Sequence, residues 1–481
     1  MYLFDEGKMT SLQTHSGSRP QKPRIVASAK LGNARDVVAM LFGPPAERAF
    51  TVRYWNGYEE NPGISSDTPF TLAFRRAGAL RRMLLPPSEL SIAEAFIDDD
   101  VDIEGNAEFA MHLGDVIGSR LQSVGGFAAL LPLLLKLPRD NEDGPLRELR
   151  RERFPHGLHS FARREGGADA IQHHYDLGND FYSLWLDSKM VYTCAYFRTP
   201  DETLDSAQEA KLDLICRKLR LEPGQRLLDI GCGWGALVMH AATHYGVRAT
   251  GITLSDAQAE LARKKIASAG LSDVCRIEIR DYRELGSEPE YDKIASVGMM
   301  EHVGSERLPG YFDAAFRVLQ PGGVFLNHAI VRDGNHIDDT TGERLKAKLW
   351  RRDQFIHRYV FPDGRLVPIA RVADCAERAG FELRDVVSLR EHYTMTLRHW
   401  LRGLEENRNK AVALVGERKY RTWRLYMLAA INGFRQGRTN IVQTLLVKCD
   451  ASGSSGLPLT RAYMGENASA ENHQPHGLAA A

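Results

Sequence analysis

Apolar positions in the central half of the chain repeat with two alternating periods, which predicts strands and helices in succession. The predicted strands are 226–230, 247–252, 274–279, 291–297 and 323–330. The predicted helices are 235–245, 256–269 and 307–319. Such alternation is typical of a parallel sheet with helices on both faces. Ligands of such sheets bind at the carboxyl ends of the strands.

The first third of the chain has a different pattern, typical of an α+β unit. Residues 49–54 and 70–74 have the composition of strands, and a helix running towards Phe96 is expected behind Ser91, whose hydroxyl would cap it. The acidic segment 98–105 lacks the positions of an EF-hand and its closing glutamate. We therefore interpret that segment as a solvated turn.

Composition divides the 481 residues into five segments. Residues 1–22 are polar and aperiodic, which indicates a disordered leader, and 23–140 form the smaller N-terminal domain. Charge, proline and glycine are dense in 141–165, the expected linker to a larger domain over 166–448. The segment 449–481 is rich in Gly, Ser, Ala and Asn and is expected to be a disordered tail.

Charge and cysteine content exclude several classes of protein. There are 62 basic and 62 acidic residues, so the formal net charge is zero and no nucleic-acid partner is expected. The six cysteines show neither a C-x-x-C pair nor zinc spacing, so we expect reduced thiols and no metal site. The N-terminus lacks the apolar core of a secretory signal, and the longest apolar run, 127–135, is far shorter than the roughly 20 residues that span a bilayer. These features predict a cytoplasmic protein.

The first predicted strand of the central half runs into a glycine-rich turn. From Leu227 to Gly235 the sequence is Leu-Leu-Asp-Ile-Gly-Cys-Gly-Trp-Gly, so a ligand can approach bare backbone there. The spacing differs from the G-x-G-x-x-G of dinucleotide folds, and no Lys-Ser/Thr pair follows to hold a phosphate. The turn therefore favours S-adenosylmethionine as the ligand and a methyltransferase as the interpretation.

Polar residues follow the next two predicted strands at the same edge of the sheet. Thr253 and Gln258 can face the ligand, whereas Ser255 or Asp256 is better suited to cap the next helix; all four could also be capping residues. After the third strand, 281–282 is Asp-Tyr: the carboxylate or a backbone amide can meet the adenine, and the ring can pack on the base. A loop aspartate beside a half-buried tyrosine is an equal alternative.

The last two strands of the series end at candidates for catalysis. Glu301 brings a carboxylate to the position where a sulfonium is expected, whereas its neighbour His302 is better explained as a hydrogen-bonded structural residue. His328 lies at the end of the fifth strand and faces the same crevice. A satisfied core histidine explains His328 equally well.

Taken together, these motifs resemble the cyclopropane-fatty-acid synthase family, which includes the mycolic acid methyltransferases. The matching runs are His174-Tyr-Asp-Leu-Gly-Asn-Asp-Phe-Tyr-Ser-Leu-Trp-Leu-Asp187, Tyr192-Thr-Cys-Ala-Tyr-Phe197, the turn at 227–235, Gly251-Ile-Thr-Leu-Ser-x-x-Gln258, Asp281-Tyr-Arg283, Val297-Gly-Met-Met-Glu-His-Val-Gly304 and His328-Ala-Ile330. The resemblance covers about 168–446. It implies a Rossmann-like class I S-adenosylmethionine-dependent methyltransferase domain. The acidic segment 98–105 also resembles the small N-terminal domain of the phospholipid-acting members, here a smaller α+β domain.

The resemblance also implies a role for each matching residue. Those implied to bind S-adenosylmethionine are Tyr192, Thr193, Leu227, Asp229, Gly231, Cys232, Gly233, Trp234, Gly235, Thr253, Leu254, Gln258, Asp281 and Tyr282. Those implied to hold a bicarbonate ion beside the methyl donor are Cys194, Glu301, His328, Ile330 through its backbone, and Tyr393.

The implied function is that of a cyclopropane-fatty-acyl-phospholipid synthase. Such an enzyme transfers a methylene unit from S-adenosylmethionine to the cis double bond of an unsaturated acyl chain, through a carbocation that bound bicarbonate deprotonates. The acyl chain must leave the bilayer, so we expect a peripheral protein at the inner face of the membrane. A homodimer is compatible with these expectations. The run 127–135 with nearby arginines would dock on anionic lipid, or it is an ordinary buried helix.

One departure from the family pattern leaves an alternative open. Family members often carry a cysteine in the segment that matches 426–435, and Ala430 occupies that position here. The alternative is a fatty acyl C-methyltransferase that gives a methyl- or methylene-branched chain. An inactive, lipid-binding scaffold is a third interpretation, against which the intact glycine turn and catalytic positions argue.

Overall fold

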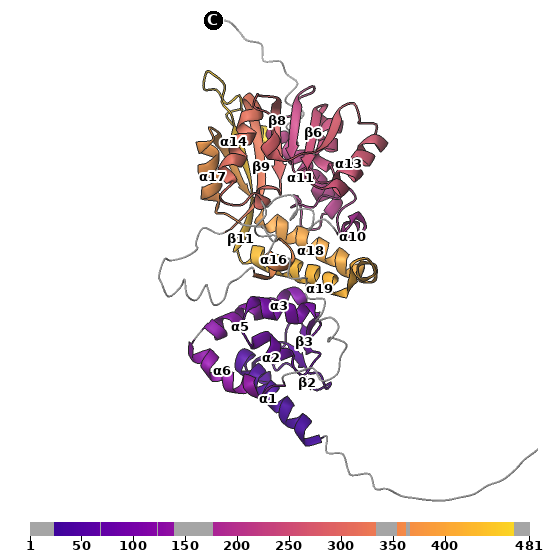
Figure 1. Ribbon diagram of the computed structural model, residues 1–481, viewed down its shortest axis with the longest axis vertical. Helices are drawn as coiled ribbons and strands as arrows, with labels where there is room; N and C mark the ends of the chain where they lie inside the picture. Colours follow the sequence, from indigo (N-terminus) through magenta and orange to yellow (C-terminus); the bar gives the residue numbers. More distant parts are fainter. Residues whose placement is uncertain are drawn as a thin grey trace, which may run out of the picture.

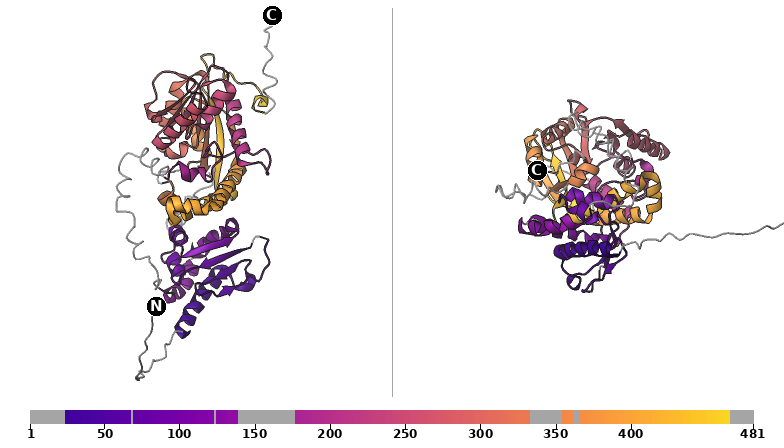
Figure 2. Two further views of the ribbon diagram at one scale, coloured as in Figure 1. Left: turned by 90° about the vertical axis from the view of Figure 1, so that its right-hand side faces the viewer. Right: turned by 60° about the horizontal axis from the view of Figure 1, so that its bottom comes forward.

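The computed structural model describes residues 24–67, 69–122, 124–138, 177–332, 354–361 and 366–465. They form two units stacked along the long axis of the molecule, with helices α18 (Arg390–Glu406) and α19 (Arg408–Arg435) at the level where the units meet (Figure 1). The view from the side has the same arrangement (Figure 2). The expected leader at 1–22, the linker at 141–165 and the start of the family-like motif at 174–176 lie outside the described residues.

The N-terminal unit combines a small sheet with helices, as the sequence predicts. Its strands, in the order β2-β1-β3-β4, are β1 (Thr51–Arg53), β2 (Glu59–Glu60), β3 (Phe70–Phe74) and β4 (Val101–Gly105). Its helices are α1 (Arg24–Phe42), η1 (Pro45–Glu47), α2 (Ala79–Leu84), α3 (Glu89–Ile97), α4 (Ala107–Ala110), α5 (His112–Gln122) and α6 (Val124–Lys136). Helix α6, which contains the apolar run 127–135, packs on α1. It buries Leu130 and Leu134 and leaves Leu135 56% exposed.

The cap of α3 differs from the prediction. Ser88, not Ser91, is the N-cap: its hydroxyl accepts a hydrogen bond from the Ser91 N–H at 3.0 Å. The Ser91 hydroxyl in turn accepts the Ser88 N–H at 3.1 Å, which completes a capping box. The helix therefore begins about one turn earlier than expected, because Ser88 is the N-cap and Ser91 is the N3 residue of the capping box.

The acidic segment 98–105 is not a solvated turn. Only its first residues form a turn, and the rest is strand β4, paired antiparallel with β3. Asp100 is fully buried, and its carboxylate lies 2.6 Å from Arg82 and 3.3 Å from Arg76. The prediction failed because the arginines that neutralise these carboxylates come from other elements.

The larger unit contains a seven-stranded sheet of order β10-β11-β9-β8-β5-β6-β7. Its strands are β5 (Arg226–Ile230), β6 (Arg248–Thr253), β7 (Cys275–Ile279), β8 (Tyr291–Val297), β9 (Leu319–Arg332), β10 (Glu382–Ser388) and β11 (Thr439–Val447). The five predicted strands are present and mutually parallel. Strand β11 is antiparallel to both of its neighbours, an extension that the sequence pattern did not predict.

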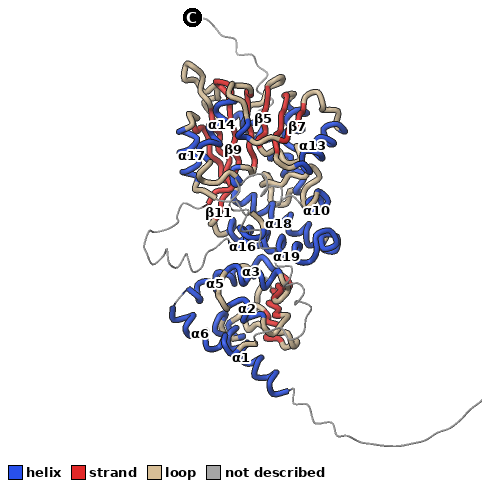
Figure 3. Tube along the Cα trace, viewed as in Figure 1, coloured by secondary structure: helices blue, strands red, loops and turns tan. Residues whose placement is uncertain are grey.

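Helices cover both faces of this sheet (Figure 3). The helices of one face are α11 (Leu204–Leu219), α12 (Ala236–Tyr245) and α13 (Asp256–Ser268), and those of the other are α14 (Leu308–Val318) and α17 (Ile369–Arg378). Alternation along β5 sends Leu227 into the first core and Leu228 into the second. Shorter elements are α10 (Asn179–Ser183), η2 (Tyr282–Glu284), η3 (Met300–His302), α16 (Gln354–Tyr359) and η4 (Ala462–Met464).

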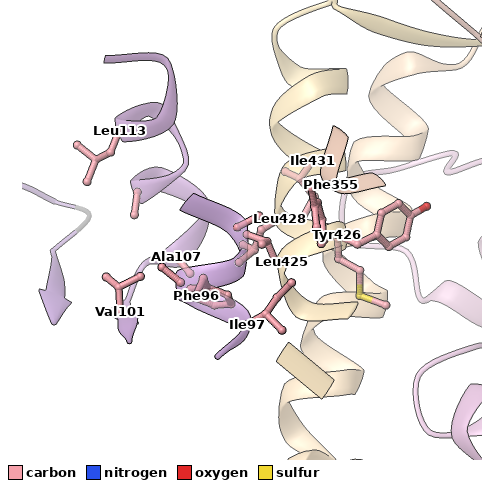
Figure 4. Packing of buried hydrophobic residues seen from close by; sticks show 14 of the residues in the cluster. Phe96, Ile97, Val101, Ala107, Leu113, Phe355, Leu425, Tyr426, Leu428 and Ile431 are labelled. Atoms are coloured by element: carbon pink, nitrogen blue, oxygen red, sulfur yellow. The ribbon is translucent and has the colours of Figure 1, made fainter. Parts of the chain in front are cut away.

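One apolar core continues through both units. Phe96 and Ile97 of α3 lie against Leu425 and Leu428 of α19 (Figure 4). Polar contacts surround this packing. Arg421, also on α19, donates hydrogen bonds to the carbonyls of residues 96 and 101 at 2.6 and 2.9 Å.

Residues 449–465 fold back over the larger unit instead of forming a disordered tail from residue 449 onwards. Arg217 of α11 donates a hydrogen bond to the Met464 carbonyl, and Arg461 lies 2.8 Å from the buried Asp385 carboxylate. Residues 466–481 lie outside the described residues. Among the helices that the structure describes, none combines the length and the apolar character needed to cross a membrane.

Candidate active site

A cavity lies at the carboxyl ends of the parallel strands, where the topology predicts a ligand site. Twelve of the fourteen residues predicted to bind S-adenosylmethionine line it: Tyr192, Thr193, Asp229, Gly231, Cys232, Gly233, Trp234, Thr253, Leu254, Gln258, Asp281 and Tyr282. Leu227 is fully buried within β5. Gly235 is the N-cap of α12, and a Cβ there would lie 3.2 Å from the Ala262 side chain; neither residue lines the cavity.

The glycine turn explains why this stretch of backbone can border a ligand. Gly231 has φ +84°, and a Cβ there would lie 2.9 Å from the side chain of Met299. Gly233 has φ +54°, and a Cβ there would meet no protein atom within 4 Å. Because Gly233 lines the cavity, that Cβ would project into the space left for the ligand.

The residues after β6 divide into a cap and a cavity wall. Ser255 caps α13 by accepting the Gln258 N–H at 3.3 Å. The Thr253 hydroxyl donates to the Gln258 side-chain oxygen at 2.9 Å, and both side chains are buried at the cavity. Their role in holding the cofactor stays a prediction, since Thr253 already uses its proton within the protein.

The residues after β7 also make contacts with other residues of the protein. Asp281 caps η2 and lies 2.7 Å from the guanidinium of Arg283. The Tyr282 ring meets the ring of Tyr311 edge-on, with centroids 5.6 Å apart. Both still line the cavity, Asp281 with its carboxylate shielded by Arg283.

Several further residues line the cavity although none of them was predicted to bind the cofactor: Met190, Val191, Lys211, Leu212, Arg280, Arg283, Val297, Gly298, Met299, His302, Val303 and Arg307. Lys211 is the most informative of them. It is 1% exposed, and its ammonium donates to the Thr193 hydroxyl at 2.8 Å. Its position in the same helical stripe as the buried Gln208 and Ile215 marks a lysine on an apolar face, a signal that the sequence does carry.

Burial shifts the pKa of two charged groups at this wall. Desolvation lowers the pKa of Lys211 to about 8, although Asp187, Cys194 and Asp229 oppose the shift. Desolvation also raises the pKa of Asp229 to about 7, with Lys211 opposing it. The lysine and the aspartate therefore stabilise each other's charged form at the cavity wall.

The five predicted catalytic residues lie together behind this cavity, and none of them lines it. Glu301 on η3 accepts the Ile330 N–H at 2.6 Å, so the Ile330 amide is already occupied. His328, two residues earlier on β9, accepts the Gly298 N–H through its carbonyl at 2.8 Å. Because Gly298 lines the cavity, His328 lies directly behind the cavity wall.

Backbone contacts bring Cys194 and Tyr393 to the same place. The Cys194 thiol is fully buried and lies 3.8 Å from the Leu389 carbonyl, and the Tyr393 N–H donates to that carbonyl at 3.0 Å. The Leu389 N–H donates to the carbonyl of Ile441, which pairs with Ile330 across β11 and β9. Cys194 and Tyr393 are thus linked through Leu389 and Ile441 to the end of β9.

Two buried atoms of this group have no hydrogen-bond partner among the described residues: the second carboxylate oxygen of Glu301, Oε2, and Nε2 of His328. Burial raises the pKa of Glu301 to about 7 and lowers the pKa of His328 well below its usual value. His328 is therefore a neutral imidazole, with Nδ1 3.3 Å from the side-chain nitrogen of Gln443. When the Gln443 amide donates to Nδ1, the His328 proton lies on Nε2, which is then a buried donor.

In comparison with known proteins, the two units match different families. A family described as mycolic acid cyclopropane synthetase matches residues 162–444, and a domain of unknown function matches residues 37–128. A probable fatty acid methyltransferase from Pseudomonas putida is 37% identical over 425 residues, which are 88% of this chain and 98% of that protein. One from Mycobacterium tuberculosis is 35% identical over 421 residues, 84% of this chain and 93% of that protein.

Among solved structures, a mycolic acid cyclopropane synthase complexed with SAH and CTAB is 37% identical, with a TM-score of 0.55. The match covers 59% of this chain and 98% of that chain. The fatty acid methyltransferases therefore match nearly the whole chain, whereas the solved cyclopropane synthase matches little more than one of its two units.

Proposed function

We propose, since this chain belongs to the mycolic acid cyclopropane synthetase family, that it is a cyclopropane-fatty-acyl-phospholipid synthase. The family comprises S-adenosylmethionine-dependent methyltransferases of lipids. The observation that carries the finer proposal is the pair of buried, unpartnered polar atoms on Glu301 and His328 beside the cofactor cavity. A methyltransferase that needs no base at this place would gain nothing from burying them unpaired.

The residues of the cavity fit S-adenosylmethionine, which would supply an electrophilic methyl group on a sulfonium. Gly233 leaves space for the ligand, while Asp281 and Tyr282 offer a carboxylate and a ring at the third strand for the adenine. At the cavity wall, Lys211 donates a hydrogen bond to the hydroxyl of Thr193 and fixes its position. These residues bind and orient the methyl donor.

The buried group behind the cavity fits bicarbonate, which would supply a weak base for a proton of the transferred methyl group. The Nε2–H of His328 and the thiol of Cys194 can donate to such an anion, and the free oxygen Oε2 of Glu301 can accept its one hydroxyl proton. Tyr393 closes the group from α18. A weak base suits an alkene substrate, because a strong nucleophile would trap the carbocation that methylation creates.

The surroundings exclude water, as methylation of an unactivated alkene requires. Trp185, Tyr192 and Trp400 form a contiguous set of rings with centroid separations of 5.2 to 5.6 Å. We expect the acyl chain of a phospholipid to reach this region from the inner face of the membrane. The N-terminal unit and the exposed Leu135 of α6 are the proposed route of membrane contact.

Two observations favour a second candidate product. Ala430 stands where many family members carry a cysteine, and it packs against the core on α19. The relatives that match nearly the whole chain are called probable fatty acid methyltransferases. The second candidate is therefore a fatty acyl C-methyltransferase that gives a methyl- or methylene-branched chain.

Lipid analysis distinguishes these products. The full chain is expressed in a host without its own cyclopropane synthase, and extracted lipids are analysed by mass spectrometry before and after mild hydrogenation. We expect an acyl chain one methylene heavier that takes up no hydrogen and whose fragments locate a ring. His328→Ala should lower its yield by about 100-fold or more, as loss of a proton-transfer partner does. His357→Ala, at an exposed histidine of α16, should leave it unchanged.

Other results would overturn the proposal. A heavier chain that takes up hydrogen, or whose fragments show a branch, supports the second candidate instead. A protein that fails to bind S-adenosylhomocysteine in calorimetry is an inactive scaffold.

A further inference from the structure

A second group of chemically active side chains lies on helices α11 and α12, away from the catalytic group. His240 and His244 are one turn apart on α12, so both imidazoles project from the same face of the helix. Their rings have centroids 4.5 Å apart. Glu209 reaches them from α11, and one ligand atom from each of the three side chains lies within 4.8 Å of the others.

His240 is the member that requires an explanation. It is 6% exposed, and neither of its ring nitrogens has a hydrogen-bond partner among the described residues. A buried polar group without a partner is costly, so such a ring in a folded protein indicates a partner that protein atoms do not supply. Burial, with His244 and Lys189 nearby, lowers the pKa of His240 to about 4. The ring is therefore neutral and can offer a lone pair.

We propose that Glu209, His240 and His244 bind a divalent transition-metal ion, for which Zn²⁺ is the natural probe. Two imidazoles and one carboxylate are an established ligand set for Zn²⁺, which completes its coordination with water. Metal–ligand distances of about 2.0–2.2 Å put neighbouring ligand atoms roughly 3–4 Å apart. Glu209 and His244 are exposed, so small rotations of their side chains close the remaining gap around the fixed His240.

The charges around the site both favour and oppose a cation. Lys189 lies 3.0 Å from the Glu209 carboxylate and competes for it, but both side chains of this pair are well exposed, so the pair is weak. Asp213, one turn after Glu209 on α11, adds a carboxylate on the same side. Its oxygens are engaged by Tyr245 at 2.6 Å and Arg217 at 2.7 Å, so it supports the site by charge rather than as a ligand.

The position of the ion gives it a structural role. Helix α11 contributes Lys211 and Leu212 to the cofactor cavity, and α12 contributes Ala236 and Leu237. An ion held between Glu209 and the two histidines would cross-link these helices one to two turns along α12 from the residues that line the cavity. We therefore expect the metal to stabilise the folded cofactor site rather than to take part in methyl transfer.

Direct metal binding tests the proposal. The full chain, freed of any histidine tag and stripped with a chelator, is titrated with Zn²⁺ and, separately, with Co²⁺, with elemental analysis after dialysis. We expect one equivalent of Zn²⁺ and a higher melting temperature in its presence. His244→Ala and His240→Ala should each weaken binding by more than about 100-fold, because loss of an outer-shell partner alone costs about 10–100-fold. His357→Ala is the control for loss of one exposed histidine.

The variant Lys189→Met tests the direction of a change in Zn²⁺ affinity, which a cluster that binds no metal would not show. Removal of the competing ammonium should tighten Zn²⁺ binding, whereas it should leave binding unchanged if the ion lies elsewhere. The Co²⁺ spectrum should lack a thiolate charge-transfer band, since none of the three ligands is a cysteine.

Three results would overturn the proposal: no Zn²⁺ uptake at micromolar concentrations, uptake that His244→Ala leaves intact, or a thiolate band. His244 is exposed, so its variant keeps the test valid even if His240→Ala fails to fold. Binding of S-adenosylhomocysteine by each variant reports that the fold is intact.

Discussion

At the Glu301 carboxylate, burial and hydrogen bonding act in opposite directions. Burial disfavours the ionised form, while the Ile330 N–H at 2.6 Å favours it. Burial prevails, and the pKa rises from 4.5 to about 7. The group therefore changes charge within the range of pH in which enzymes are assayed.

This shift predicts a dependence of stability on pH. Between about pH 4.5 and 7 the folded protein holds a proton on Glu301 that the unfolded chain has lost, so the free energy of unfolding falls as pH rises through this window. The full effect is on the order of 3 kcal/mol. Glu301→Gln should flatten the dependence, measured by urea unfolding at several pH values. Asp229 changes the free energy of unfolding in the same direction, so part of its dependence on pH should remain in the variant. If the variant and the unchanged protein show parallel curves of this free energy against pH, the assignment of the effect to Glu301 is wrong.

At the scale of elements, the turn between β5 and α12 joins the sheet to the ligand. A Cβ on Gly233 would enter the cavity without touching protein. Gly233→Ala should therefore weaken S-adenosylhomocysteine binding about tenfold or more in calorimetry, as overpacking by one methyl does in a filled site. Gly224→Ala is the matched control, because Gly224 also has positive φ and open surroundings but does not line the cavity. Equal losses in both variants would show backbone strain rather than a ligand clash.

The elements that the sequence predicts well are those with local signals. The strands 226–230 and 291–297 agree residue for residue with β5 and β8, since each is a short apolar run bounded by turns. Strands β10 and β11 were not predicted, because β11 takes its place in the sheet by pairing with β9, and β10 by pairing with β11, across long stretches of chain. The cap at Ser88 was missed because two serines three residues apart both fit a cap.

The same distinction holds for the candidate site. The edge of the sheet that holds the cavity followed from the topology, and twelve of the residues that line the cavity were named from the family resemblance. The meeting of Cys194 with Tyr393 at the Leu389 carbonyl joins segments about two hundred residues apart, which no local period encodes. The cluster of His240 and His244 with Glu209 also escaped notice, since only the two histidines share a helix and cysteine spacing says nothing of them.

At the scale of the whole molecule, Arg421 is a buried polar link between the two units. It is 5% exposed, donates to two carbonyls of the N-terminal unit, and lies 3.2 and 3.3 Å from the carboxylates of Asp99 and Asp102. Removal of one partner from a buried ion pair leaves the others uncompensated.

Arg421→Ala should therefore lower the free energy of unfolding by about 3 kcal/mol and separate the melting of the two units in calorimetry. Arg408→Ala is the control on the same helix: Arg408 pairs with Glu417 at an exposed position, so its loss should cost less than about 1 kcal/mol. A single sharp transition in Arg421→Ala, with unchanged stability, would mean that the apolar contacts alone join the units.

Helix α19 also constrains how such a protein can gain or lose a domain in evolution. Leu425 and Leu428 lie against the N-terminal unit, while Trp423 of the same helix belongs to the ring cluster beside the cofactor cavity. The two units are therefore not exchangeable modules, although they match two separate families. Loss of the N-terminal unit in evolution would expose the apolar face of α19. Polar residues would have to replace that face before the remaining domain could be stable by itself. A recombinant that gains the unit must acquire Arg421 and its apolar neighbours together with it.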